Sequence, residues 1–191
     1  IEKGWHPVLE QMDDKSGEPQ KILKNDTTLT QETNMMLITG PNMSGKSTYM
    51  RQVALIVILA KIGSPVPAAS ATVGKINSVF TRIGSADDLF GGRSTFMVEM
   101  TETAKILNVA DENSLVLIDE IGRGTSTADG LSLAWSIAEE LTASNKALSL
   151  FSTHYFELTN LPKYKKTISN FHIETIEQDD RIIFLYKLKK G

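Results

Sequence analysis

Continuously apolar stretches and amphipathic stretches alternate along most of this chain. Residues 35–38, 115–118 and 147–152 form apolar runs of the kind that becomes a strand buried on both faces of a parallel sheet. The stretches with apolar side chains at helical spacing are 44–62, 95–109 and 128–142. This alternation predicts a three-layer α/β domain with a mainly parallel central sheet.

Weaker strand patterns occur outside these elements. The segments 8–10 and 21–23 are expected to form a small antiparallel margin of the sheet, and 72–76 and 78–83 are expected to be further short strands. Residues 168–176 and 181–187 alternate on either side of a polar turn and predict a hairpin.

The helix expected over residues 95–109 has an apolar side and an acidic side. Phe96, Met100, Ala104 and Leu107 are expected to face the core. Glu99 and Glu102 are expected to face solvent.

A phosphate-binding motif follows the first of the apolar runs. Gly40, Gly45, Lys46 and Ser47 fit the spacing G-x-x-x-x-G-K-[ST] between an expected strand and an expected helix. In such a loop the backbone N–H groups and the lysine bind phosphates, and the hydroxyl binds Mg²⁺. The alternative, a strand-to-helix turn with a solvated lysine, is disfavoured because all four positions and both flanking elements are present.

Two acids end the apolar run 115–118. Asp119 is suited to hold Mg²⁺ opposite Ser47, and Glu120 to activate a water molecule. Alone, two acids after a strand more often mean solvated charges. Beside a complete phosphate loop, they favour a nucleotide hydrolase.

Three further positions carry a functional and a structural interpretation each. Ser94 precedes a helix behind two glycines and Arg93, either as an ordinary N-cap or as a second anion site that a facing chain would use. His154 follows an apolar strand, either as a structural histidine or as a sensor of the γ-phosphate. Arg123 is either a solvated charge or a link from the acids to a neighbouring subunit.

The composition of the chain excludes several classes of protein. The 191 residues include no cysteine, which excludes disulfides and thiolate metal sites, and a net charge of −3 gives no basic face for nucleic acid. The longest apolar run, 53–60, is far shorter than the roughly 20 residues that cross a membrane. The amino terminus lacks the pattern of a secretory signal, so the expected location is the cytoplasm.

Four segments together resemble the ATPase domain of the DNA mismatch-repair family MutS. They are ITGPNMSGKSTY at 38–49, RSTFMVEMTET at 93–103, LVLIDEIGRGTSTAD at 115–129 and STHYFELT at 152–159. The likeness extends over residues 1–191, which are expected to form one domain of a larger protein. It implies a P-loop NTPase fold of the ABC and RecA type, with antiparallel strands at the sheet margins.

The resemblance also implies roles for individual residues. ATP would be bound by Gly40, Pro41, Asn42, Met43, Ser44, Gly45, Lys46, Ser47 and Thr48. Ser47 and Asp119 would serve Mg²⁺, Glu120 and Lys46 would act in catalysis, and His154 would sense the γ-phosphate. Ile22 and Leu23 fall where the family packs adenine, and Ser94 would reach the ATP of a second subunit.

For the parent protein, the resemblance implies a dimer with composite ATP sites. ATP-driven closure would couple mismatch recognition on DNA, through domains absent from this chain, to a sliding clamp that recruits MutL. Two other functions remain possible from the sequence. A phosphotransferase is disfavoured because the chain lacks an arginine-rich lid segment. A nucleotide-binding module without turnover is disfavoured because both Asp119 and Glu120 are present.

Overall fold

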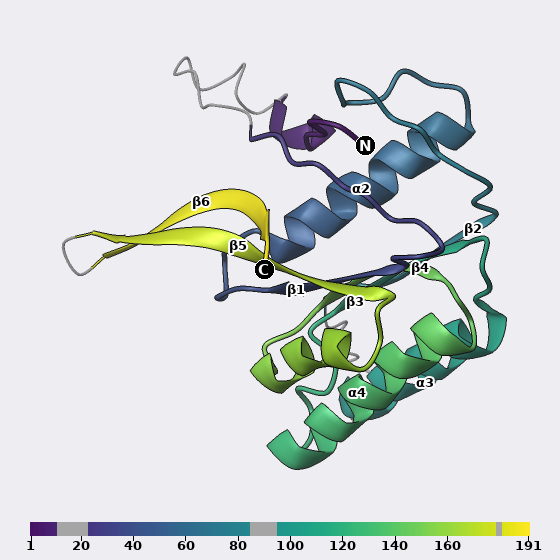
Figure 1. Ribbon diagram of the computed structural model, residues 1–191, viewed down its shortest axis with the longest axis vertical. Helices are drawn as coiled ribbons and strands as arrows, with labels where there is room; N and C mark the ends of the chain where they lie inside the picture. The colour runs from purple at the N-terminus through teal and green to yellow at the C-terminus, as the bar shows by residue number, and fades with distance from the viewer. Residues whose placement is uncertain (11–22, 85–94, 179–180) are drawn as a thin grey trace.

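A six-stranded sheet forms the centre of the computed structural model, which describes residues 1–10, 23–84, 95–178 and 181–191 (Figure 1). Its strand order is β2-β3-β4-β1-β5-β6. The strands are β1 (Met35–Thr39), β2 (Ser78–Arg82), β3 (Ser114–Asp119), β4 (Leu148–Ser152), β5 (Ile168–Gln178) and β6 (Arg181–Lys190). All neighbours are parallel except β6, which runs antiparallel to β5 at the edge. The α/β fold with a mainly parallel sheet and an antiparallel margin is therefore confirmed.

Helices cover both faces of the sheet (Figure 1). On one face lies α2 (Lys46–Lys61); on the other lie α3 (Thr95–Val109), α4 (Thr127–Ala143) and the 3₁₀ helix η1 (Phe156–Lys163). Each face has its own apolar core, and strands β1, buried throughout, and β3, buried from Ser114 to Ile118, contribute side chains to both. Burial on both faces explains why these strands are continuously apolar.

The prediction of early strands at the sheet margin is wrong. Residues 7–10 are helical, because Pro7 suits the first helical position and the carbonyl of His6 accepts from Leu9 at 3.1 Å. Residues 72–76 are also not a strand, since Ile76 N–H turns back to the carbonyl of Gly74 at 2.9 Å. Of the segment 21–23, only Leu23 is described, and it is not in a strand.

The expected orientation of α3 is partly wrong. Its buried positions are Glu99, Thr103 and Ile106, whereas Ala104 is exposed. Glu99 is buried because Arg82, at the end of β2, lies beside it with 3.8 Å between Nη2 and Oε1. Glu102 does face solvent, as expected.

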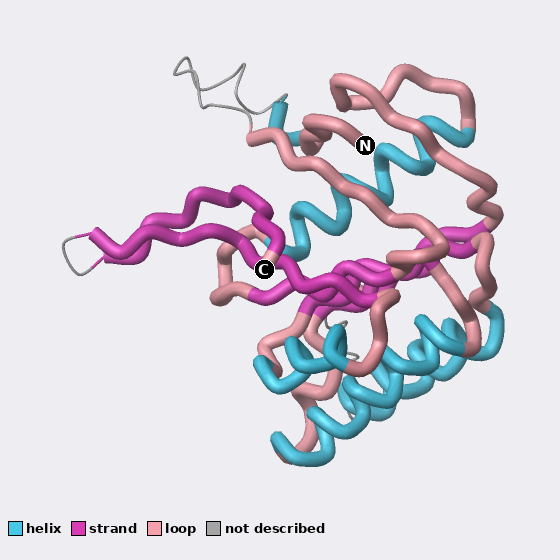
Figure 2. The backbone as a smooth tube through the Cα atoms, viewed as in Figure 1, coloured by secondary structure: helices cyan, strands magenta, loops and turns pink. Residues whose placement is uncertain are grey.

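The hairpin of β5 and β6 extends beyond the body of the domain (Figure 2). Near its base, Asn25 donates to the carbonyl of Tyr186 at 3.1 Å and accepts from Leu188 N–H at 2.8 Å. These two bonds hold the segment around Asn25 against β6. Of the helices in the described part of the chain, none has the length and apolar character needed to cross a membrane.

Candidate active site at the carboxyl end of the sheet

The phosphate loop expected from the sequence connects β1 to α2. Gly45 caps the amino end of α2 with a φ of 94°, a left-handed conformation that suits glycine. The first N–H groups of an α-helix have no partner within it, so this end favours an anion. Ser44 is only 1% exposed, and its hydroxyl has no hydrogen-bond partner among the described residues. A buried hydroxyl in this position is available to a phosphate oxygen.

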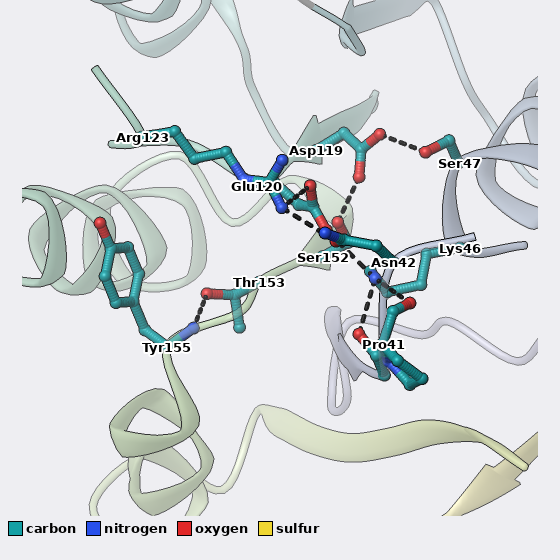
Figure 3. A network of polar contacts seen from close by, with 11 residues as sticks. Pro41, Asn42, Lys46, Ser47, Asp119, Glu120, Arg123, Ser152, Thr153 and Tyr155 are labelled. Carbon is teal, nitrogen blue, oxygen red and sulfur yellow. Dashed lines mark hydrogen bonds and ion pairs between the residues drawn. The ribbon is translucent and has the colours of Figure 1, made fainter. Parts of the chain in front are cut away.

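Lys46 directs its ammonium back over the loop (Figure 3). Nζ donates to the carbonyls of Gly40 at 2.7 Å and Pro41 at 2.9 Å, and it lies 3.1 Å from Oε1 of Glu120. The side chain is buried, so these oxygens replace water around the charge. Lys46 thus joins the phosphate loop to the acidic end of β3.

Asp119 lies at the end of β3 between two hydroxyls (Figure 3). Its Oδ2 accepts from Ser47 Oγ at 2.5 Å, and its Oδ1 accepts from Ser152 Oγ. Ser152 is opposite Asp119 in the β3–β4 register. The carboxylate is therefore fixed from one side by the sheet and directed at the hydroxyl of the phosphate loop.

Glu120 turns away from the strand direction with a φ of 52°. Its N–H donates to the carbonyl of Ser152 at 3.1 Å, which anchors the turn to β4. Its carboxylate contacts two cations, Lys46 at 3.1 Å and Arg123 at 2.5 Å. Arg123 also donates to Oδ1 of Asn42 at 3.1 Å, so this guanidinium bridges the two loops within one chain (Figure 3).

His154 is exposed beside the same end of the sheet, and its ring lies against that of Tyr155, tilted by 38° with centroids 4.0 Å apart. Partial burial and the positive charge of Arg123 lower the pKa of His154 below its usual value of 6.5. Lys46 acts in the same direction, whereas Glu120 acts against it. The imidazole is therefore mainly neutral at pH 7.

The remaining predicted residues lie around this centre. Pro41, Asn42 and Met43 are exposed on the loop, and Thr48 is half-buried in the first turn of α2. Leu23, expected at the adenine, is 42% exposed. Ile22 and Ser94 lie outside the described residues.

Tyr186 is an aromatic residue that sequence reasoning missed. A Cβ added to Gly45 would lie 2.9 Å from Cδ1 of Tyr186, so the ring lies directly against the phosphate loop. The residue is 43% exposed. Alternation along β6 does not reveal this position, because a bulge shifts the β5–β6 register between Ile173 and Thr175 and Tyr186 itself has a φ of 52°.

The comparison with known families gives one finding. The family model of MutS domain V matches residues 36–191. This match begins in β1 and includes the phosphate loop, both acids of the 119–120 pair and the terminal hairpin.

Proposed function

The chain belongs to the MutS family, and from this membership we propose that it is the ATP-binding and ATP-hydrolysing domain of a DNA mismatch-repair protein. One observation carries the proposal: Lys46 of the phosphate loop lies 3.1 Å from Glu120, while Ser47 bonds Asp119 at 2.5 Å. One end of the sheet thus brings together a cation suited to phosphate, two oxygen ligands suited to a metal ion and a carboxylate suited to act as a base. This set is what hydrolysis of a nucleoside triphosphate requires.

The residues of the loop would bind the phosphates of ATP. The free N–H groups at the start of α2, the Ser44 hydroxyl and the Lys46 ammonium all supply positive charge or donors. In this arrangement Lys46 would exchange its carbonyl partners, Gly40 and Pro41, for phosphate oxygens. Because phosphate carries full charge, the new contacts are the stronger ones.

Ser47 and Asp119 fit a magnesium site. They place a hydroxyl and a carboxylate oxygen within 2.5 Å of each other, and oxygen donors are what this hard cation prefers. Bound with ATP, Mg²⁺ would neutralise phosphate charge. Ser152 would keep the Asp119 carboxylate in place.

Glu120 would orient and deprotonate the attacking water. In this structure its carboxylate is paired with Lys46 and Arg123, and these contacts occupy both of its oxygens. A γ-phosphate would compete for Lys46 and so release part of that pairing. Neutral His154 would donate a hydrogen bond to the same phosphate without adding a charge.

The adenine would lie beside the phosphate loop, between the segment at Leu23 and the ring of Tyr186. Asn25 holds this segment against β6 through the carbonyl of Tyr186 and the N–H of Leu188. A half-exposed aromatic ring next to the loop offers a face on which a base can stack. Ile22 remains part of this proposal.

The wider assignment follows from the family. We propose an ABC-type domain, one part of a larger protein, that completes each ATP site with Ser94 of a second subunit. Closure of such a dimer on ATP would turn mismatch recognition by other domains into a sliding clamp that recruits MutL. The γ-phosphate would then bias a two-state interface through the loops that touch it.

Hydrolysis measured against protein concentration tests the proposal. We expect Mg²⁺-dependent release of phosphate from ATP, with a rate per subunit that rises with concentration and falls in Ser94→Ala. Ser132→Ala, which removes an exposed serine of α4, is the matched control and is expected to change nothing. A phosphorylated acceptor in place of free phosphate would contradict the hydrolase, and a rate independent of both concentration and Ser94 would contradict the composite site.

A further inference from the structure

Gly122, in the turn after β3, is held by hydrogen bonds on both sides of its backbone. Its N–H donates to Oε2 of Glu99 at 3.1 Å, and its carbonyl accepts from the Tyr155 hydroxyl at 3.0 Å. Glu99 lies in α3, and Tyr155 follows β4. Two elements distant in sequence therefore fix one residue of this turn.

The backbone of Gly122 also packs tightly against α4. A Cβ at this position would lie 2.8 Å from the carbonyl oxygen of Gly130, and Gly122 has a φ of 89°. A Cβ on Gly130 would in turn lie 2.1 Å from the Tyr155 hydroxyl. The turn is thus confined by packing as well as by hydrogen bonds.

Glu99 is a buried carboxylate, and the cost of burying its charge is offset by nearby partners. It is 7% exposed, and Arg82 lies 3.8 Å from its Oε1. Arg82 also pairs with the exposed Glu102 at 3.1 Å. A buried charge is tolerated when it is paired and hydrogen-bonded, and Glu99 has both an ion-pair partner and a backbone donor.

This cluster lies next to the catalytic groups. Gly122 is two residues after Glu120, and Tyr155 directly follows His154. Thr95 and Phe96, at the start of α3, line the same pocket as Asp119 and Glu120. A displacement of α3 would therefore move the acceptor that holds the turn containing Glu120.

We propose that Glu99 is a positioning residue for ATP hydrolysis: by accepting the Gly122 N–H, it holds the turn that aims Glu120 and makes that aim depend on the placement of α3. The inference rests on the proposed function, since Glu120 acts there as the base. It gives α3 a part in its own subunit's site, separate from the reach of Ser94 into a partner's site. Burial and the negative charge of Glu99 raise the pKa of Tyr155, whose hydroxyl is the second anchor of the turn.

Two substitutions separate the hydrogen bond from the charge. Glu99→Asp keeps the charge beside Arg82 but shortens the side chain, so the carboxylate no longer reaches Gly122. Glu99→Gln keeps the length and an acceptor oxygen but removes the charge, while Glu102 still compensates Arg82. Glu140→Asp makes the same shortening at an exposed acid of another helix, α4, and it is the matched control.

Hydrogen exchange measured on this chain tests the Gly122–Glu99 hydrogen bond and does not require ATP turnover. We expect the Gly122 amide to exchange roughly tenfold faster or more in Glu99→Asp, because a buried bonded amide becomes free. Glu99→Gln and Glu140→Asp should remain near the parent rate. Unchanged protection in Glu99→Asp would overturn the proposal.

ATP turnover by the dimeric protein tests whether this hydrogen bond affects the chemical step. In Glu99→Asp we expect kcat to fall about tenfold or more while the Kd for ATP stays within about twofold, since a misaimed base affects the chemical step and not binding. Glu99→Gln should retain most of kcat. If Glu99→Gln falls as far as Glu99→Asp, the charge and not the hydrogen bond matters, and the proposal is wrong. Absence of turnover in the parent protein would refute the proposed function instead, and the exchange result would then stand alone.

Discussion

Two glycine-containing turns meet at the carboxyl end of this sheet, and they differ in whether their polar groups are already hydrogen-bonded. The phosphate loop keeps donors free: the Ser44 hydroxyl has no partner among the described residues, and Lys46 is held by carbonyls that a phosphate can replace. The turn after β3 has its groups committed, with Gly122 bonded to Glu99 and Tyr155. Under the proposed function, the first turn would receive the phosphates and the second would hold the Glu120 side chain in place.

The neighbours of the two glycines differ in the same sense. Against Gly45 lies the ring of Tyr186, a side chain that is able to rotate away. Against Gly122 lies the backbone of Gly130, which cannot move without α4. The comparison teaches that binding and positioning make different demands on a loop at a single site.

Alanine at each glycine gives the largest expected effect on stability. Both positions have a positive φ, so Gly45→Ala should cost about 1–2 kcal/mol of unfolding free energy. Gly122→Ala adds overpacking against backbone and should cost roughly 2–4 kcal/mol. ATP affinity should show the reverse order, with the greater loss in Gly45→Ala. Urea unfolding and nucleotide titration check both rankings, and the same order in both measurements would contradict the distinction.

A smaller effect is expected from the side chain that lies against Gly45. Tyr186→Ala should weaken ATP binding roughly three- to tenfold, because a stacked aromatic contact contributes about 0.5–1.5 kcal/mol. Tyr186→Phe, which keeps the ring, should bind ATP like the parent. Titration with ATP and with inorganic triphosphate makes the test specific, since only ATP carries the base. An equal loss for both ligands would show that the ring supports the loop and does not contact the base.

The smallest expected effect concerns His154, beside an anchor of the second turn. Its pKa in the folded state is lowered from 6.5 by partial burial and by Arg123, so below about pH 6.5 the unfolded state binds more protons than the folded state. This contribution to stability is complete above that pH and is lost as the pH falls toward the lowered pKa. His154→Gln should therefore flatten the dependence of the melting temperature on pH in this window.

His6 provides the control for that measurement. Its pKa is also lowered, by burial and then by the charge of Arg51. In a variant with both histidines replaced, the melting temperature should depend less on pH than in either single variant. A His154→Gln curve parallel to that of the parent would show that this histidine has no such role.

The sequence is informative about the phosphate loop because the whole motif is contiguous and follows a strand that is apolar throughout. The same holds for β3 and its two acids, and for the terminal hairpin. The partners of the second turn are not local: Glu99 is 23 residues from Gly122, and Tyr155 is 33 residues away. Nothing near Glu99 in the chain indicates that Arg82 will lie beside it, so the expectation that this acid faces solvent was reasonable and wrong.

Cross-strand register limited the prediction in the same way. Ser152 bonds Asp119 only because β4 lies beside β3 in a particular alignment, which alternation does not specify. Tyr186 reaches Gly45 through a bulge in the last hairpin. The short helical turn at residues 7–10 shows a further limit, because Pro7 decides the local conformation against weak alternation.

The central claim is that the turn after β3 aims Glu120 at a water molecule beside phosphates held by the other loop. The most direct measurement is single-turnover hydrolysis of ATP by Glu120→Gln, with the nucleotide shown to be fully bound. We expect the rate to fall roughly 100-fold or more while ATP affinity is maintained, because a general base contributes only to the chemical step. Glu112→Gln, at an exposed acid before β3, is the matched control. A rate for Glu120→Gln equal to that of the parent, at full occupancy, would contradict the account.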